Sequence, residues 1–151
     1  MTVTVTVTAL LTTAQLLLLV TGTLSDGSSC GLRSSGLEQG SNITLTVINN
    51  MPNTNQINLT YSARTAFRGS LLGAMRGLQE ADCSFTFTTT ENINYGPYLE
   101  SVNGVVGKTC DRTYWELLSQ HANGTIISLD VGIGCYIPNP NERIILKFTK
   151  W

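Results

Sequence analysis

Residues suited to catalysis are scarce in this sequence. His121 is the only histidine among 151 residues, and it lies in a polar stretch. A nucleophilic site needs a base that a third group orients, and one loop histidine does not provide that arrangement. No carboxylate spacing singles out an acid–base pair, and no glycine-rich phosphate loop is present. We therefore expect a protein that is not an enzyme.

Charge is also scarce. Lys, Arg, Asp and Glu make up 13% of the chain, and the formal net charge is −1. Proteins that bind the phosphate backbone of nucleic acids need a basic patch or stripe. This sequence has none, so we expect no nucleic acid partner. The length suits a single domain with a substantial core.

Long apolar runs are limited to one, from Leu10 to Val20. It is shorter than the roughly 20 apolar residues that span a bilayer, so we expect no membrane partner. Such a run, followed by small residues at Gly22 and Ser25, is typical of a secretory signal peptide, although residues 1–8 carry no Lys or Arg. We assign residues 1–22 to a signal peptide and expect a secreted, extracellular protein; an uncleaved anchor is the alternative.

Four cysteines lie beyond this segment, at Cys30, Cys83, Cys110 and Cys135. An even number in a short exported chain favours two disulfides, formed in an oxidising compartment. Four cysteines allow three pairings, and the sequence does not choose among them. Buried free thiols are the alternative. No two cysteines have the C-x₂₋₄-C spacing of a zinc site, so we predict no metal site.

Three N-x-S/T sequons accompany the cysteines. Their asparagines are Asn42, Asn58 and Asn123. In the secretory pathway of a eukaryote each is a potential glycan site, and Asn123 precedes a glycine in a pattern typical of an exposed turn. We expect a glycoprotein with at least one of these sites occupied.

The remaining chain predicts many strands and one helix. Residues 23–41 are rich in Gly and Ser and form an expected flexible lead. Apolar residues at helical spacing predict a helix over 70–81, and residues 113–119 are ambiguous between a strand and a helical turn. Alternating or β-branched runs predict strands over 43–48, 56–62, 84–90, 98–102, 125–129, 132–137 and 143–149. This order indicates an α+β fold, β-grasp-like, with a mostly antiparallel sheet and one main helix.

Aromatic residues gather in the second half of the chain. We expect Tyr95, Tyr98 and Trp115 to be partly exposed, because two of them flank a Gly-Pro turn and the third precedes a glutamate. Burial is favoured for Tyr114 and Trp151, since such side chains usually bury most of their area.

Several ordered motifs resemble one known family. They include Y-G-P-Y at 95–98, S-V-N-G-V at 101–105, D-R-T-Y-W-E-L-L-S at 111–119, Y-I-P at 136–138 and L-x-F-T at 146–149. Together they are similar to the C-terminal β-domain of the cobalamin carriers, the family of transcobalamin, intrinsic factor and haptocorrin. The run at 111–119 is most like haptocorrin. The similarity covers roughly residues 43–151, so we assign 42–151 to this domain.

The resemblance implies extracellular binding and transport of cobalamin, vitamin B12. In those carriers the ligand lies between a helical barrel and this small β-domain. Two segments of the β-domain contact it. Carried onto this sequence, the contact residues are Asn94, Tyr95, Gly96, Pro97, Tyr98 and Leu99 on one wall, and Trp115, Glu116, Leu117, Leu118 and Ser119 on the other.

No helical barrel accompanies the β-domain in this sequence. The resemblance therefore implies weaker binding alone, or a separate helical cobalamin-binding domain or a cell-surface receptor as partner. The alternative is a secreted, disulfide-bonded glycoprotein that serves as an interaction module and has lost cobalamin binding.

Overall fold

The computed structural model describes residues 40–151. The expected signal peptide, nearly all of the lead, and Cys30 lie outside the described residues. The elements follow in the order β1 (Ser41–Asn49), β2 (Ile57–Thr65), α1 (Leu71–Ala81), β3 (Phe87–Asn92), β4 (Gly96–Val102), β5 (Val105–Val106), the 3₁₀ turn Thr109–Asp111, β6 (Thr113–Gln120), β7 (Ile126–Ser128) and β8 (Arg143–Lys150).

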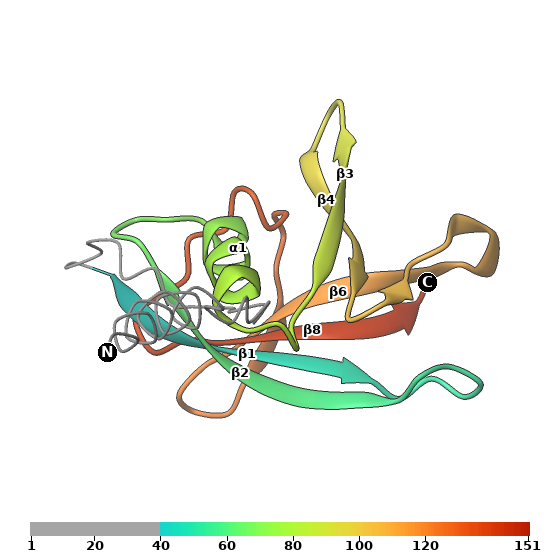
Figure 1. The fold of residues 1–151 in the computed structure, drawn as a ribbon, viewed down its shortest axis with the longest axis horizontal. Coiled ribbons are helices and arrows are strands. Elements are labelled where there is room, and N and C mark those ends of the chain that lie inside the picture. The colour runs from blue at the N-terminus through green and yellow to red at the C-terminus, as the bar shows by residue number, and fades with distance from the viewer. Residues whose placement is uncertain (1–39) are drawn as a thin grey trace, which may run out of the picture.

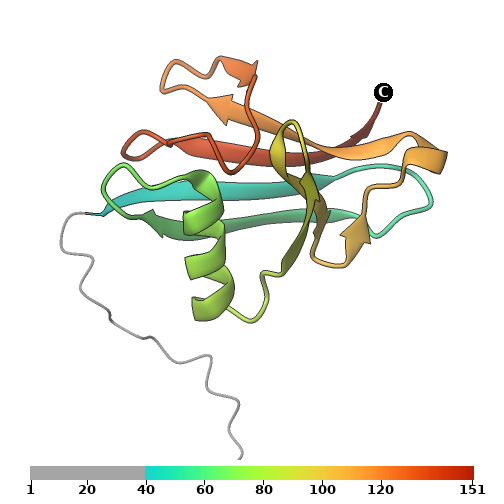
Figure 2. The same cartoon turned by 90° about the horizontal axis from the view of Figure 1, so that it is seen from above.

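Two sheets organise these strands. Five strands form one sheet in the order β2-β1-β8-β6-β7, and β3, β4 and β5 form the other. All neighbouring strands are antiparallel except the central pair β1 and β8, which is parallel. Figures 1 and 2 show α1 and the β3–β4 hairpin on the same face of the larger sheet, with the hairpin projecting away from it. The α+β prediction is confirmed.

The helix begins where the sequence offers a cap. The Ser70 hydroxyl accepts a hydrogen bond from the backbone N–H of Gly73 at 3.4 Å, which satisfies one of the donors that a helix start leaves free. Helical spacing then places the apolar residues on one side. The buried ones are Leu71, Leu72, Ala74, Met75 and Leu78. This face packs on the sheet, as the prediction over 70–81 requires.

The core lies between the helix, the hairpin base and the larger sheet. Alternation in β1, β6 and β8 turns one side of each strand inward. Cross-strand pairing aligns Trp115 with Phe148 and Leu117 with Leu146. The rings of Trp115 and Phe148 lie 5.1 Å apart, and both side chains are at most 5% exposed. The ambiguous segment 113–119 is therefore a strand.

One predicted strand is wrong. Residues 132–137 form a turn, in which the backbone N–H groups of Cys135 and Tyr136 both donate to the Gly132 carbonyl, at 3.0 and 3.1 Å. The alternating pattern predicted a strand, but a strand also needs a neighbouring strand as hydrogen-bonding partner, and this segment has none. Its carbonyls instead receive the first N–H groups of α1, from Leu71 and Leu72.

The cysteine prediction also needs correction. Cys110 and Cys135 are free and exposed, so the expectation of two disulfides is wrong at these two positions. Cys83 has an interaction partner of its own. An even cysteine count thus did not establish pairing, because the count carries no information on distance.

Candidate functional site

A groove of about 290 Å³ opens beside the projecting hairpin. Three segments form its walls: the hairpin tip, strand β6, and the segment 128–133, which begins at the last residue of β7 and is otherwise irregular. The groove is lined by Asn92, Tyr95, Gly96, Pro97, Tyr98, Leu99, Tyr114, Trp115, Glu116, Leu117, Ser128, Leu129, Asp130, Val131, Gly132 and Ile133. The larger sheet fixes β6, so the shape of the groove depends on how the hairpin and the irregular segment pack against it.

The hairpin wall owes its shape to a tight, self-contained tip. The Asn92 side-chain oxygen accepts hydrogen bonds from the backbone N–H groups of Asn94 at 2.9 Å and Tyr95 at 3.1 Å. Gly96 follows with φ +71°, a backbone conformation that favours glycine. Tyr95 and Tyr98 are then 80% and 46% exposed, as predicted from their positions around the turn.

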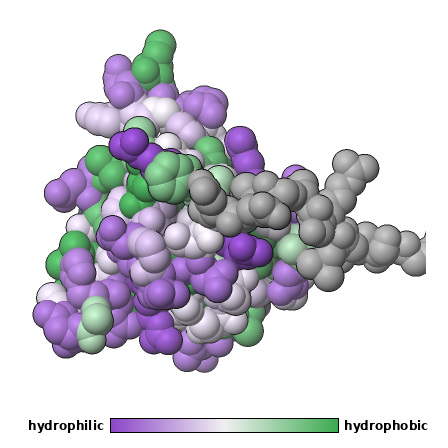
Figure 3. Space-filling model, turned by 90° about the vertical axis from the view of Figure 1, so that its left-hand side faces the viewer, coloured by the Kyte–Doolittle hydropathy of each residue, from purple (hydrophilic) through white to green (hydrophobic). Residues whose placement is uncertain are grey.

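Hydrophobic side chains mark the end of this hairpin. Ile93 at the tip is 99% exposed, which is unusual for a large aliphatic side chain next to two exposed tyrosines. Figure 3 shows a hydrophobic group at the top of the molecule, where the hairpin ends. Exposed apolar side chains that cluster in this way are typical of a binding surface.

The β6 wall differs from the prediction. Trp115 is only 3% exposed, and its indole N–H donates to the Val105 carbonyl at 2.9 Å. The expected partial exposure of this ring is therefore wrong, because the strand's alternation places it on the core side. It contributes the floor of the groove. Glu116 is partly exposed and lies 3.6 Å from the ammonium group of Lys147.

Burial was also mispredicted for the last residue. Trp151 is 61% exposed, although its ring lies 5.7 Å from that of Tyr114 and covers part of it. Tyr114 itself is half-buried. Its ring contact with Tyr114 leaves most of the Trp151 side chain exposed.

The third wall was missed by sequence reasoning. Leu129 is fixed to β6 by a hydrogen bond from its backbone N–H to the Leu117 carbonyl at 2.9 Å. Gly134 packs against Pro97 so closely that an added Cβ would lie 2.9 Å from Pro97 Cγ. The only available signal was Gly132 and Gly134 in an otherwise apolar run, since glycine in a strand pattern often marks close backbone approach.

Eight of the eleven predicted contact residues line the groove. They are Tyr95, Gly96, Pro97, Tyr98, Leu99, Trp115, Glu116 and Leu117. The other three are Asn94, Leu118 and Ser119. Of these, Ser119 is fully buried, and its hydroxyl donates to the Glu142 carboxylate instead. The structure therefore brings the two predicted segments together on one groove.

The groove is mostly apolar with a few polar groups. Burial, and to a smaller extent the neighbouring Tyr114, raise the pKa of the Tyr98 phenol. Its hydroxyl is a hydrogen-bond donor. Two acidic residues, Glu116 and Asp130, also line the groove. Among residues 40–151 no group of His, Cys, Asp or Glu is suited to hold a metal ion. A mostly apolar groove with a few polar groups is typical of a site for a small-molecule ligand.

Known proteins with related sequences are cobalamin carriers. Transcobalamin-1 from Homo sapiens is 32% identical over 98 residues, which cover 64% of this chain and 22% of that protein. Cobalamin binding intrinsic factor from Mus musculus is 30% identical over 94 residues, which cover 62% of this chain and 21% of that protein. The chain thus spans about a fifth of the length of these relatives. No known protein-family profile matches it.

Solved structures support the same relationship. Haptocorrin, in a crystal structure in complex with Cbi, matches with a TM-score of 0.61 and 25% identity, over 74% of this chain and 25% of that chain. A protein from Ruminococcus gnavus matches in fold, with a TM-score of 0.51 and 14% identity, over 74% of this chain and 98% of its own. The predicted resemblance to the cobalamin carriers is confirmed. The described residues contain no helix long and apolar enough to cross a membrane.

Proposed function

We propose that this chain is a secreted, non-enzymatic cobalamin-binding domain whose groove receives one edge of the corrin ring. One observation carries the proposal. The resemblance to the carriers places ligand contacts in two segments, 94–99 and 115–119, and residues 95–99 of the first and 115–117 of the second line one groove. These segments are far apart in the sequence, and the fold is needed to bring them together.

The chemistry of the groove fits such a ligand. Cobalamin is a broad disc with apolar edges and peripheral amides. The Tyr95 and Tyr98 rings and the side chain of Leu117 offer apolar contact, while the Tyr98 hydroxyl is a donor to amide carbonyls. Glu116 and Asp130 are acceptors for amide N–H groups. Binding of this kind uses only apolar contacts and hydrogen bonds, and it requires no catalytic residue.

The size of the groove limits what it can cover. Pockets for drug-sized ligands have volumes of roughly 300–1,000 Å³. The groove has about 290 Å³, so it holds one edge of a ligand as large as cobalamin. The remaining surface of the ligand would face outward. We propose that a separate helical cobalamin-binding domain, or a cell-surface receptor, covers it, because two-sided burial raises affinity and selectivity.

Export and modification belong to the same proposal. The asparagines of the three sequons, Asn42, Asn58 and Asn123, are all exposed. Asn123 lies in a turn, where its side-chain oxygen accepts a hydrogen bond from the Thr125 N–H at 3.0 Å. Glycosylation requires asparagines that are accessible at the protein surface. A shift in mass after enzymatic deglycosylation of the secreted protein would test this part.

Equilibrium titration with hydroxocobalamin tests the central claim. We expect a saturable change in the corrin absorbance that weakens at least fivefold in Tyr98→Ala. Phe67→Ala is the matched control, because Phe67 is an exposed aromatic residue, at 72%, that lies outside the groove. No saturation at millimolar cobalamin, alone or with a helical partner domain, would reject the proposal.

A second candidate is an interaction module that no longer binds the vitamin. The observation in its favour is Ile93, which is 99% exposed at the hairpin tip and does not line the groove. Affinity capture from extracellular fluid separates the two candidates. A partner that is lost in Ile93→Asn but retained in Tyr98→Ala would favour the interaction module.

A further inference from the structure

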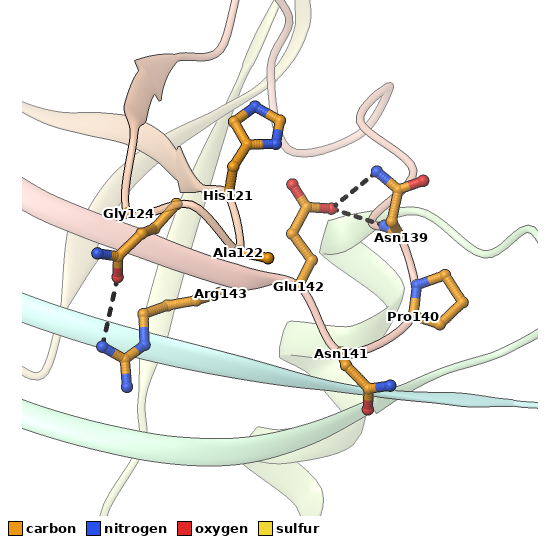
Figure 4. A pocket seen from close by; sticks show the side chains of 9 residues that line it. His121, Ala122, Gly124, Asn139, Pro140, Asn141, Glu142 and Arg143 are labelled. Atoms are coloured by element: carbon orange, nitrogen blue, oxygen red, sulfur yellow. Dashed lines mark hydrogen bonds between the residues drawn. The ribbon is translucent and has the colours of Figure 1, made fainter.

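Glu142 is a buried carboxylate that lies outside the candidate groove. It directly precedes β8 and is only 8% exposed. One carboxylate oxygen accepts hydrogen bonds from the Ser119 hydroxyl and, at 2.5 Å, from the Tyr136 phenol. The other accepts from the backbone N–H of Asn139 at 2.6 Å and from its side-chain amide at 3.3 Å. Figure 4 shows the contacts to Asn139.

Hydrogen bonds, and not an ion pair, compensate the charge of the Glu142 carboxylate. Glu142 lines an outer cavity of about 480 Å³ together with His121 and Arg143, the two cationic or titratable side chains that share this cavity. Arg143 hydrogen-bonds Gln120 at 3.3 Å instead of Glu142 (Figure 4). A buried carboxylate is costly unless donors compensate it. Four donors, from Ser119, Tyr136 and Asn139, compensate it here. Through these bonds the three segments that carry the donors are all held at the Glu142 carboxylate.

Tyr136 connects the Glu142 carboxylate to the groove. Its phenol binds Glu142, its backbone N–H donates to Gly132, and its carbonyl accepts from the Leu71 N–H at 2.8 Å. The carbonyl of Ile133 accepts from Leu72 at 2.9 Å. Both Gly132 and Ile133 line the groove. The turn 132–136 is therefore held at the start of α1 on one side and at Glu142 on the other.

The third wall has few other restraints. Residues 129–142 contain no helix or strand, so no ladder of hydrogen bonds fixes them. The bond from Leu129 to Leu117 secures the beginning of the segment. Its end is secured by the bond from the Asn141 N–H to the Asn42 carbonyl, at 2.7 Å, and by the Glu142 carboxylate. The hydroxyl of Ser119, at the far end of β6, joins this second anchor to the same sheet that carries the β6 wall.

We propose that Glu142 is a positioning residue for the groove: by accepting four hydrogen bonds it fixes the segment 129–138 in the shape that completes the third wall. It acts without touching the ligand. The consequence for affinity rests on the proposed cobalamin binding, whereas the consequence for the shape of the wall does not.

The experiment compares the full chain with Tyr136→Phe, Ser119→Ala and Glu142→Gln. Tyr136→Phe removes one hydrogen bond and keeps the ring, so it remains informative if Glu142→Gln fails to fold. Thr46→Val is the control, because it removes a 3.3 Å hydrogen bond to Thr60 from a residue that is 8% exposed and whose side chain makes no hydrogen bond to Glu142 or its four donors.

Two readouts by NMR test the positional role. Amide hydrogen exchange at Leu129, Leu71 and Tyr136 should accelerate at least fivefold in Tyr136→Phe and stay within twofold in Thr46→Val. In the wild-type chain the amide signals of Asn139, Tyr136 and Ile133 should shift with one common midpoint as acid protonates Glu142, and this titration should be absent in Glu142→Gln. Separate midpoints, or unchanged exchange, would overturn the proposal.

Cobalamin titration of the same variants separates the two proposals. Affinity reduced by about five- to tenfold in Tyr136→Phe, with Thr46→Val unchanged, supports the role of Glu142 in binding. Equal affinity of Tyr136→Phe and wild type would overturn that role. If the wild-type chain binds no cobalamin, the proposed function fails, and the two NMR readouts still decide whether Glu142 fixes the wall.

Discussion

Gly134→Ala perturbs the contact between two walls of the groove. A Cβ at this position would lie 2.9 Å from Pro97 Cγ and 3.2 Å from Pro97 Cδ. Carbon atoms pack favourably at about 3.5–4.0 Å, so the turn and the hairpin must separate by several tenths of an ångström. Proline cannot rotate its ring away as a flexible side chain would. The substitution therefore pushes the third wall from the hairpin.

The magnitude follows from two opposing effects. Overpacking of a well-packed contact costs about 1–3 kcal/mol. Replacing glycine by alanine also restricts the unfolded chain, which stabilises the fold by about 0.4–1 kcal/mol. We therefore expect Gly134→Ala to lower the free energy of unfolding by about 1 kcal/mol, the difference between the central values of these two ranges. Urea denaturation, followed by circular dichroism, measures this difference.

Gly77→Ala is the matched control of opposite sign. Gly77 is exposed on α1, and nothing lies within 4 Å of an added Cβ. Alanine in a helix interior is favoured over glycine by about 0.5–1 kcal/mol, so this variant should be more stable than the wild type. The pairing of Gly134 with Pro97 can be tested by a double variant. In the Pro97→Ala background, Gly134→Ala should cost at least about 0.5 kcal/mol less than it costs in the wild-type chain. A Gly134→Ala chain as stable as the wild type would refute the close packing of these walls.

Three further substitutions address the acid stability, the groove floor and the helix. Burial raises the pKa of Glu142, but hydrogen bonds from Ser119, Tyr136 and Asn139 outweigh it and leave that pKa below 4.5. The contribution of Glu142 to stability is thus present above pH 4.5 and is lost as the pH falls through its folded-state pKa. In Glu142→Gln the free energy of unfolding should therefore decrease less as the pH is lowered through this range. Trp115→Phe should cost about 1–3 kcal/mol in urea denaturation, because it removes the donor to Val105. Ser70→Ala should cost about 0.5–1 kcal/mol by the same assay, and an unchanged midpoint would contradict the capping role.

Much of the fold could be predicted because regular elements leave periodic patterns. The helix over 70–81 and the strands over 43–48 and 56–62 were evident from apolar spacing, and all three are present, with the two strands paired as β1 and β2. An Asn-Gly pair, such as Asn103 and Gly104, is typical of a tight turn, and both residues have positive φ here, at 47° and 78°. Element ends differ by up to three residues, since fraying and caps decide them locally.

The groove could be predicted only in part. The hairpin tip and β6 carry motifs that a resemblance can transfer, and eight transferred residues do line one groove. The third wall carries no periodic pattern, because its backbone bonds to α1 and β6 instead of to a neighbouring strand. The burial of Trp115 was missed for a related reason. Its exposure depends on which side of β6 faces the core, and that is set by pairing with β8.

Chemical-shift mapping with hydroxocobalamin tests the central claim most directly. Addition of the ligand to the ¹⁵N-labelled chain should shift the amide signals of Tyr98, Leu117 and Gly132, one from each wall of the groove. Signals of Asn141 and Arg143, in the outer cavity, should remain in place. Shifts confined to the outer cavity, or no shifts at millimolar ligand, would contradict the assignment of the groove as the cobalamin site.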